Sequence, residues 1–122
     1  MPDADAASTI DAVDRFNEAF NRHDIEAVMA AMTDDCVFES TSPPDGERHV
    51  GQAAVRRAWE AFFASSPTAR FDTEEVIAAG DRCVVRWLYV WSDDDTEHHV
   101  RGVDVFRARE GLVAEKLSYV KG

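Results

Sequence analysis

The spacing of apolar residues predicts a helix near the start of the chain. The apolar positions are Ile10, Val13, Phe16 and Phe20. Side chains that recur every three or four positions lie on one face of a helix, so we expect a helix over about residues 8–23. Residues 1–7 are small and acidic, and we expect them to be disordered.

A shorter second helix is predicted directly after the first. Asp24 is a suitable N-cap, and Ile25, Val28, Met29 and Met32 follow it at helical spacing. Because only a few residues separate the two apolar patterns, we expect the helices to form an antiparallel hairpin.

A strand, a break and a third helix are predicted next. Residues 36–41 alternate in polarity, and the turn residues of segment 42–46 end this strand. An extended piece over 47–50 precedes Gly51, which starts a helix that ends at 65–67. The apolar stripe of this helix comprises Ala54, Val55, Ala58, Trp59, Phe62 and Phe63.

The second half of the chain alternates with a period of two, which is typical of strands. The predicted strands are residues 71–79, 82–91, 97–107 and 112–119. Short turns rich in Gly and Asp connect them, so we expect an antiparallel meander.

The strand over 82–91 has two different faces. Val85, Trp87, Tyr89 and Trp91 share one face. Such a row of large side chains either lines a pocket under a concave sheet or fills the core. Leu88 and Val90 lie on the opposite face, where a symmetric homodimer would cover them.

Length, charge and cysteine content limit the possible roles. With 122 residues, the chain is expected to form one domain over residues 8–122. A formal net charge of −11 disfavours nucleic acid and anionic membranes as partners. We expect a cytoplasmic protein, because neither a signal peptide nor a membrane-spanning segment is recognisable. Cys36 and Cys83 lie in separate apolar runs, which predicts reduced core thiols.

The stretch EHHVRGVDVFR contains the candidate catalytic carboxylate, Asp104. The apolar residues on both sides of Asp104 indicate an interior position. A buried carboxylate is costly unless it is paired or protonated. Asp104 is therefore either an acid or base in a pocket, or a structural residue bonded to backbone or paired with a cation such as Arg86 or Lys116.

Several polar side chains could join Asp104, and His98 is the best candidate among them. The set comprises His98, Ser40, Lys116, Ser118, Tyr89 and His49. His98 has the same strand parity, and its imidazole can shuttle a proton near neutral pH. Its place near a hairpin tip leaves a solvated surface role as the alternative. His49, before the third helix, is a further polar candidate. His98 and His99 face opposite ways on a strand, so we expect no metal site there.

The order of elements resembles the SnoaL-like branch of the nuclear transport factor 2-like superfamily. Three pieces carry this resemblance: FNEAFNRHDIEAVMAAMTDDCVFE, HVGQAAVRRAWEAFF and HVRGVDVFRAREGLVAEKLSYVKG. The resemblance implies an α+β fold, a cone-shaped α+β barrel in which three N-terminal helices pack on a curved antiparallel sheet. This superfamily includes many enzymes as well as proteins without catalysis, so the fold alone does not settle the function.

The resemblance also allows a comparison with enzymes of the superfamily. Ketosteroid isomerases use two Asp side chains and a Tyr, whose places correspond here to Asp104, Ser40 and Phe16. Serine is no carboxylate base and phenylalanine has no donor, so we reject steroid isomerisation. The Asp-Arg-Asp cluster of epoxide hydrolases would need Arg101, which has the opposite parity to Asp104. SnoaL-like cyclases are thought to depend on one acidic residue in the cavity, a role that Asp104 fits.

Together these observations predict a small-molecule pocket protein. Its enzymatic interpretation is a cofactor-independent proton-transfer enzyme with isomerase, cyclase or lyase chemistry on an apolar carbonyl compound, in which Asp104 and His98 are catalytic. The alternative is a non-catalytic binding or dimerisation module with a filled cone. The expected pocket-lining residues are Phe16, Phe20, Met32, Phe38, Ser40, Trp59, Phe63, Val85, Trp87, Tyr89, Val100, Gly102, Lys116 and Ser118. We expect an apolar small-molecule ligand, a homodimer, and no metal or other cofactor.

Overall fold

The computed structural model describes residues 4–122, which form three helices and six strands. The helices are α1 (Ala4–Asn21), α2 (Ile25–Ala30) and α3 (Gln52–Ser65). The strands are β1 (Met32–Glu39), β2 (Arg48–Val50), β3 (Arg70–Ala79), β4 (Arg82–Asp93), β5 (Thr96–Arg109) and β6 (Leu112–Val120). Between residues 4 and 122, no helix has both the length and the hydrophobicity needed to cross a bilayer.

All six strands belong to one curved, unclosed sheet with the order β2-β1-β6-β5-β4-β3. The predicted antiparallel meander of β3, β4, β5 and β6 is confirmed. The prediction of a wholly antiparallel sheet is wrong at one pair, because β1 runs parallel to β6. Strands so distant along the chain are paired by tertiary folding, and their alternation carries no information about direction.

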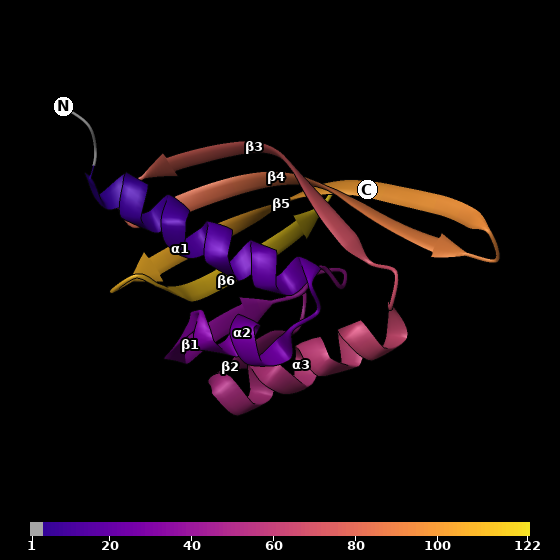
Figure 1. Cartoon of the computed structure of the whole chain (residues 1–122), viewed down its shortest axis with the longest axis horizontal. Helices are drawn as coiled ribbons and strands as arrows, with labels where there is room; N and C mark the ends of the chain where they lie inside the picture. Colours follow the sequence, from indigo (N-terminus) through magenta and orange to yellow (C-terminus); the bar gives the residue numbers. More distant parts are fainter. Residues whose placement is uncertain (1–3) are drawn as a thin grey trace.

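The helices pack against the concave side of the sheet. Figure 1 shows α1 lying along the sheet, α2 and α3 below it, and the β4–β5 hairpin projecting beyond the helices. Phe16 of α1, Trp59 of α3 and Phe106 of β5 are fully buried. The Phe16 ring lies 5.3 Å from the Trp59 ring and 5.8 Å from the Phe106 ring, centroid to centroid, so the core joins both helices to the sheet.

The first helix begins earlier than the sequence predicts. Residues 4–7 belong to α1 and are helical rather than disordered, whereas residues 1–3 of the predicted disordered segment lie outside the described residues. The Thr9 hydroxyl, which is buried, donates a hydrogen bond of 2.7 Å to the Gly80 carbonyl in the β3–β4 turn. This tertiary contact holds the start of the helix against the sheet.

The boundary between α2 and β1 also differs from the prediction. Met32 was expected on the second helix, but it is the first residue of β1 and pairs with Val113 of β6. The Val113 backbone N–H donates to the Ala31 carbonyl over 2.9 Å. The side-chain amide of Gln52 donates to the Met32 carbonyl over 3.3 Å. Hydrogen bonds to distant elements thus override the local helical pattern.

The predicted cap of the second helix is confirmed, and it yields a stability prediction. The Asp24 carboxylate accepts a hydrogen bond of 3.1 Å from the Ala27 amide. Asp24→Ala is expected to lower the free energy of unfolding by about 1 kcal/mol, because that amide loses its acceptor. Denaturant midpoints measure this change, with Asp34→Ala, at an exposed site outside the cap, as the control. Equal midpoints for wild type and Asp24→Ala would contradict the role of the cap.

Both cysteines are free and buried, which confirms the prediction of reduced core thiols. Burial raises the pKa of the Cys36 thiol to about 11, and it raises the pKa of the Cys83 thiol to about 11. The reactive thiolate form is therefore scarce near neutral pH.

Candidate functional site

A cavity of about 550 Å³ lies between the inner face of the sheet and α3. Its walls include Trp87 and Tyr89 of β4, Asp104 of β5, and Lys116 and Ser118 of β6. Ligand sites in proteins typically have volumes of roughly 300–1,000 Å³. The cone is therefore open, and the alternative of a cone filled by side chains is wrong.

Small side chains on α3 help to leave this space. Ala54, Ala58 and Ala61 line the cavity, and their spacing of four and three positions places them on one side of the helix. These residues were not among the predicted lining residues. The sequence signal that identifies them is this alanine row beside large aromatics, because an alanine facing aromatic neighbours leaves unfilled volume.

The polar group at the inner wall of the cavity consists of Asp104, Ser118 and Lys116. Asp104 and Ser118 are direct partners across the β5–β6 pair, and Lys116 shares their face of the sheet, two residues before Ser118. The Lys116 Nζ donates to the Ser118 Oγ over 2.9 Å, and the Ser118 hydroxyl donates to the Asp104 Oδ1 over 2.7 Å. The Lys116 Nζ also lies 3.5 Å from the Asp104 Oδ1. Lys116 and Asp104 therefore form an ion pair, and the Ser118 hydroxyl bridges the two side chains.

This ion pair lies in largely apolar surroundings. Asp104 is 5% exposed, Lys116 7% and Ser118 9%. The Lys116 Nζ lies 4.9 Å from the centre of the Phe38 ring and 5.7 Å from that of Phe20, within range of cation–π attraction. Of the two predicted cation partners, Lys116 is therefore correct, whereas Arg86 pairs with Glu75 at 3.1 Å.

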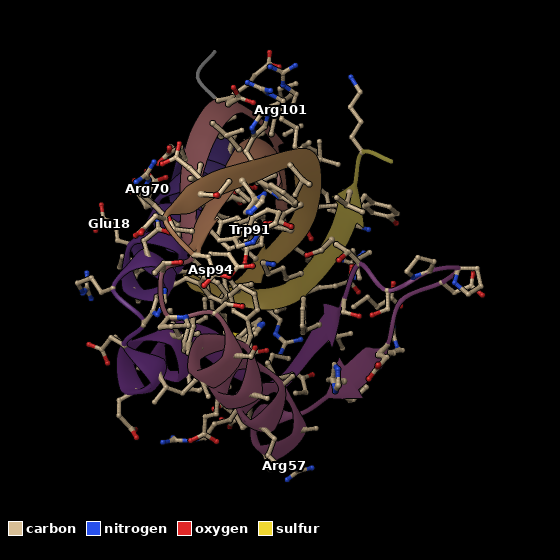
Figure 2. The ribbon with its side chains drawn as sticks, turned by 90° about the vertical axis from the view of Figure 1, so that its right-hand side faces the viewer. Glu18, Arg57, Arg70, Trp91, Asp94 and Arg101 are labelled. Atoms are coloured by element: carbon tan, nitrogen blue, oxygen red, sulfur yellow. The ribbon has the colours of Figure 1, made fainter. Side chains whose placement is uncertain are left out.

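The rim of the cavity is polar. Its polar residues are Ser40, Thr41, Ser42, Glu47, His49 and Arg57. The His49 ring stacks on Phe38 at 5.8 Å, and its Nε2 lies 4.0 Å from the Glu47 carboxylate. In Figure 2 the loop between β1 and β2 extends away from the body, and Arg57 lies on α3. Within residues 4–122, no three His, Cys, Asp or Glu side chains are grouped closely enough to hold a metal ion.

The structure brings part of the predicted set together at the cavity. The predicted residues that line it are Phe20, Phe38, Ser40, Trp59, Trp87, Tyr89, Asp104, Lys116 and Ser118. Lining residues that the prediction did not include are Thr41, Ser42, Glu47, His49, Ala54, Arg57, Ala58, Ala61, Phe62 and Phe71. Most of the additional residues come from α3 and the β1–β2 loop, whose position over the sheet is a tertiary feature.

Several predicted residues do not line the cavity. Phe16, Met32 and Val85 have the expected inward direction, but neighbouring side chains cover them in the core. Phe63 stacks instead on His23, with ring centroids 4.6 Å apart. The prediction of these four as lining residues is wrong, because the first three are enclosed in the core and the Phe63 ring packs against α1 and His23.

Val100 and Gly102 are also absent from the cavity wall. Gly102 pairs with Trp87, and a Cβ atom at Gly102 would lie 2.5 Å from the Trp87 Cη2 and 2.2 Å from the Tyr119 carbonyl oxygen. The Trp87 indole therefore occupies the space beside Gly102 and forms the wall in its place. Val100 pairs with Tyr89, which likewise lines the cavity itself.

His98 is not a partner of Asp104. Its ring stacks on Trp91, with centroids 5.3 Å apart, near the tip of the β4–β5 hairpin. Figure 2 shows Trp91 on the inner side of the curved sheet, close to Asp94 at the hairpin tip, and Arg101 on the outer side. Six residues along a strand separate His98 from Asp104 by roughly 20 Å. Same-face parity was correct, but it does not imply proximity. Of the polar side chains expected beside Asp104, Ser118 and Lys116 contact it, and His98 does not.

Comparison with known proteins agrees with this architecture. Residues 13–116 match the family model of the SnoaL-like domain. The chain is similar to an NTF2-like protein of unknown function from Mesorhizobium loti, with 41% identity and a TM-score of 0.84. That match covers 100% of this chain and 98% of the other.

More distant structures share the fold alone. A candidate polyketide cyclase from Xanthomonas campestris has 20% identity and a TM-score of 0.76, covering 97% of this chain and 93% of its own. TerC, co-crystallised with polyporic acid, has 19% identity and a TM-score of 0.81, covering 93% of this chain and 92% of its own. No curated protein sequence matches this chain.

Proposed function

The chain belongs to the SnoaL-like domain family, and from this premise we propose that its cavity binds an apolar carbonyl compound and moves a proton on it. The observation that carries this proposal is the position of Asp104, a buried carboxylate at the wall of an open cavity. Asp104 is the acid or base, and no cofactor takes part in the step.

The polar group at the inner wall suits proton abstraction next to a carbonyl. Removing such a proton moves negative charge onto the carbonyl oxygen, and donors placed near that oxygen stabilise the charge. The Lys116 ammonium is such a donor, because it has three N–H groups and gives only one of them to Ser118, and Asp104 is the acceptor for the proton. The reaction class that this supports is isomerisation, cyclisation or elimination through an enolate.

The remaining walls suit the apolar body of such a ligand. Phe20, Phe38, Trp59 and Trp87 contribute large rings to the lining. The fold neighbour TerC was co-crystallised with polyporic acid, and candidate polyketide cyclases share the same fold. These similarities support a small organic ligand for the cone.

An exchange experiment tests the proposal. 1-Indanone, which has an exchangeable proton next to its carbonyl, is incubated with the protein in heavy water, and deuterium incorporation is followed by NMR. We expect exchange faster than in buffer by roughly 10²-fold or more. Quenching of tryptophan fluorescence reports binding, because Trp59 and Trp87 line the cavity. Indane, which lacks the carbonyl, is the binding control. Saturating 1-indanone with exchange no faster than in buffer would overturn proton transfer.

We also propose a homodimer through the outer face of the sheet. The predicted uncovered site at Val90 is wrong, because Val90 is only 6% exposed within the single chain. An outer apolar row instead crosses four strands through Ile77, Val84, Val105 and Leu117, which are successive cross-strand partners. Ile77 is 57% exposed, and a second copy of the chain would cover this row.

Sedimentation velocity at roughly tens of micromolar protein is expected to show a dimer. Tyr119, which is 55% exposed on the same face, offers a test variant. Tyr119→Asp is expected to weaken the dimer by about tenfold or more, since it places a charge in an apolar interface. Val120→Asp is the matched control, because Val120 is 41% exposed on the same strand and points to the opposite face of the sheet. A monomeric wild type would contradict the dimer.

A further inference from the structure

The Lys116 side chain carries a primary amine at the wall of the cavity. In the proton transfer proposed for Asp104, Lys116 serves only as a hydrogen-bond donor to the ligand. Its side chain is 9% exposed, yet the residue lines the cavity. Lys116 and Lys121 are the only lysines in the sequence. A neutral amine attacks aldehydes and ketones, and enzymes use such lysines to form imines. An ammonium group must first lose a proton to do so.

The hydrogen bonds around Lys116 provide a path for that proton. The Lys116 Nζ donates to the Ser118 Oγ over 2.9 Å, and the Ser118 hydroxyl donates to the Asp104 Oδ1 over 2.7 Å. One proton moving from Lys116 to Ser118, while another moves from Ser118 to Asp104, converts the ion pair into a neutral amine and a neutral carboxylic acid. No charge has to leave the buried group during this relay.

We infer that Lys116 captures aldehydes or ketones in the cavity as an imine, with Ser118 and Asp104 relaying the protons. The neutral Lys116 nitrogen forms a bond to the carbonyl carbon, and its proton passes to the carbonyl oxygen to give a carbinolamine. The Asp104 carboxylic acid then protonates the hydroxyl group, the C–O bond breaks and water leaves. The products are an iminium ion on Lys116 and a carboxylate on Asp104.

The charges of this product match the charges of the resting site. An iminium beside the Asp104 carboxylate replaces an ammonium beside the same carboxylate. A cation placed near the rings of Phe38 and Phe20 therefore remains paired, and no uncompensated charge is buried. The ligand class that follows is a carbonyl compound with an apolar body. This inference rests on the proposed carbonyl-binding cavity and adds covalent capture to it.

Reductive trapping tests the inference. The protein is incubated with benzaldehyde and sodium cyanoborohydride, which reduces an imine to a stable amine, and peptides are mapped by mass spectrometry. We expect one benzyl group on Lys116, formed at an initial rate about tenfold or more above that at Lys121. Benzyl alcohol, which has no carbonyl to attack, should quench tryptophan fluorescence without forming an adduct.

Variants test whether trapping at Lys116 depends on the proton relay or only on the access of the aldehyde to the amine. Ser118→Ala keeps the amine and the carboxylate but removes the hydroxyl between them, and it is expected to slow trapping at Lys116 by roughly 10²-fold. Ser8→Ala, an exposed serine on α1, should leave the rate unchanged. Lys121→Arg should also retain the Lys116 adduct, whereas Lys116→Arg should lose it while keeping the buried cation.

The outcomes distinguish this inference from the proposed function. Fluorescence quenching by benzaldehyde with benzyl groups only on Lys121 and the N-terminal amine would overturn imine formation and leave the carbonyl-binding cavity in place. Trapping at Lys116 with an unchanged rate in Ser118→Ala would overturn the relay. No quenching by benzaldehyde or benzyl alcohol, and no adduct at Lys116, would overturn both the inference and the proposed cavity function.

Discussion

Asp104→Asn is expected to lower the free energy of unfolding by about 3–5 kcal/mol. The amide cannot balance the Lys116 ammonium, which lies 3.5 Å from the carboxylate and is buried with it. Thermal or denaturant unfolding measures this loss. The same variant is expected to abolish proton exchange on 1-indanone, because an amide does not accept the proton.

The double variant Asp104→Asn/Lys116→Met separates the structural effect from the chemical one. Removing both charges leaves no unpaired ion, and methionine resembles lysine in length and flexibility, so most of the lost stability should return. Proton exchange should remain absent in this variant. Exchange at the wild-type rate in the double variant would show that Asp104 is not the proton acceptor, and unchanged stability in Asp104→Asn would contradict the buried ion pair.

Trp59→Ala is expected to be the other strongly destabilising change, by about 3–5 kcal/mol. Trp59 is 1% exposed, and its ring lies 5.3 Å from Phe16, 5.5 Å from Phe20 and 5.0 Å from Phe38, centroid to centroid. Its loss removes the contacts that join α3 to α1 and β1. Because Trp59 also lines the cavity, the truncation should enlarge the site and weaken the binding of 1-indanone.

Two further variants serve as controls for Trp59→Ala. Phe106→Ala should cause a comparable loss of stability without changing ligand affinity in the folded protein, because Phe106 is fully buried and lies outside the cavity wall. Trp59→Phe should cost less, since it keeps a ring and removes a buried indole N–H that has no acceptor among residues 4–122. Equal ligand affinity in Trp59→Ala and wild type would contradict the role of Trp59 in the cavity wall.

Local patterns in the sequence determined most of the elements. Alternation with a period of two located β3 to β6, and apolar spacing located the three helices, because both depend only on neighbouring positions. The Asp24 cap could also be predicted from the sequence, since the amide that it accepts from, that of Ala27, is only three residues away. The expected burial of Asp104 is confirmed, although Val103 and Val105 point to the opposite, partly exposed face. The informative neighbour is Phe106, which is two residues away on the same face and is fully buried.

Contacts between distant segments decided the rest. The parallel pairing of β1 with β6 placed Met32 in a strand, and docking against the β3–β4 turn holds the early start of α1. The partner of Asp104 was equally nonlocal, because pairing across β5 and β6 brought Ser118 beside it and left His98 far along the same strand.

The open cavity itself is a tertiary feature. Sequence parity places large rings on the inner face of β4, but parity does not state how much volume those rings leave unfilled. That volume depends on how far the sheet curves and where α3 presents Ala54, Ala58 and Ala61. Side-chain direction is a local property of a strand or helix, whereas enclosed space depends on the relative positions of elements that only the folded chain brings together.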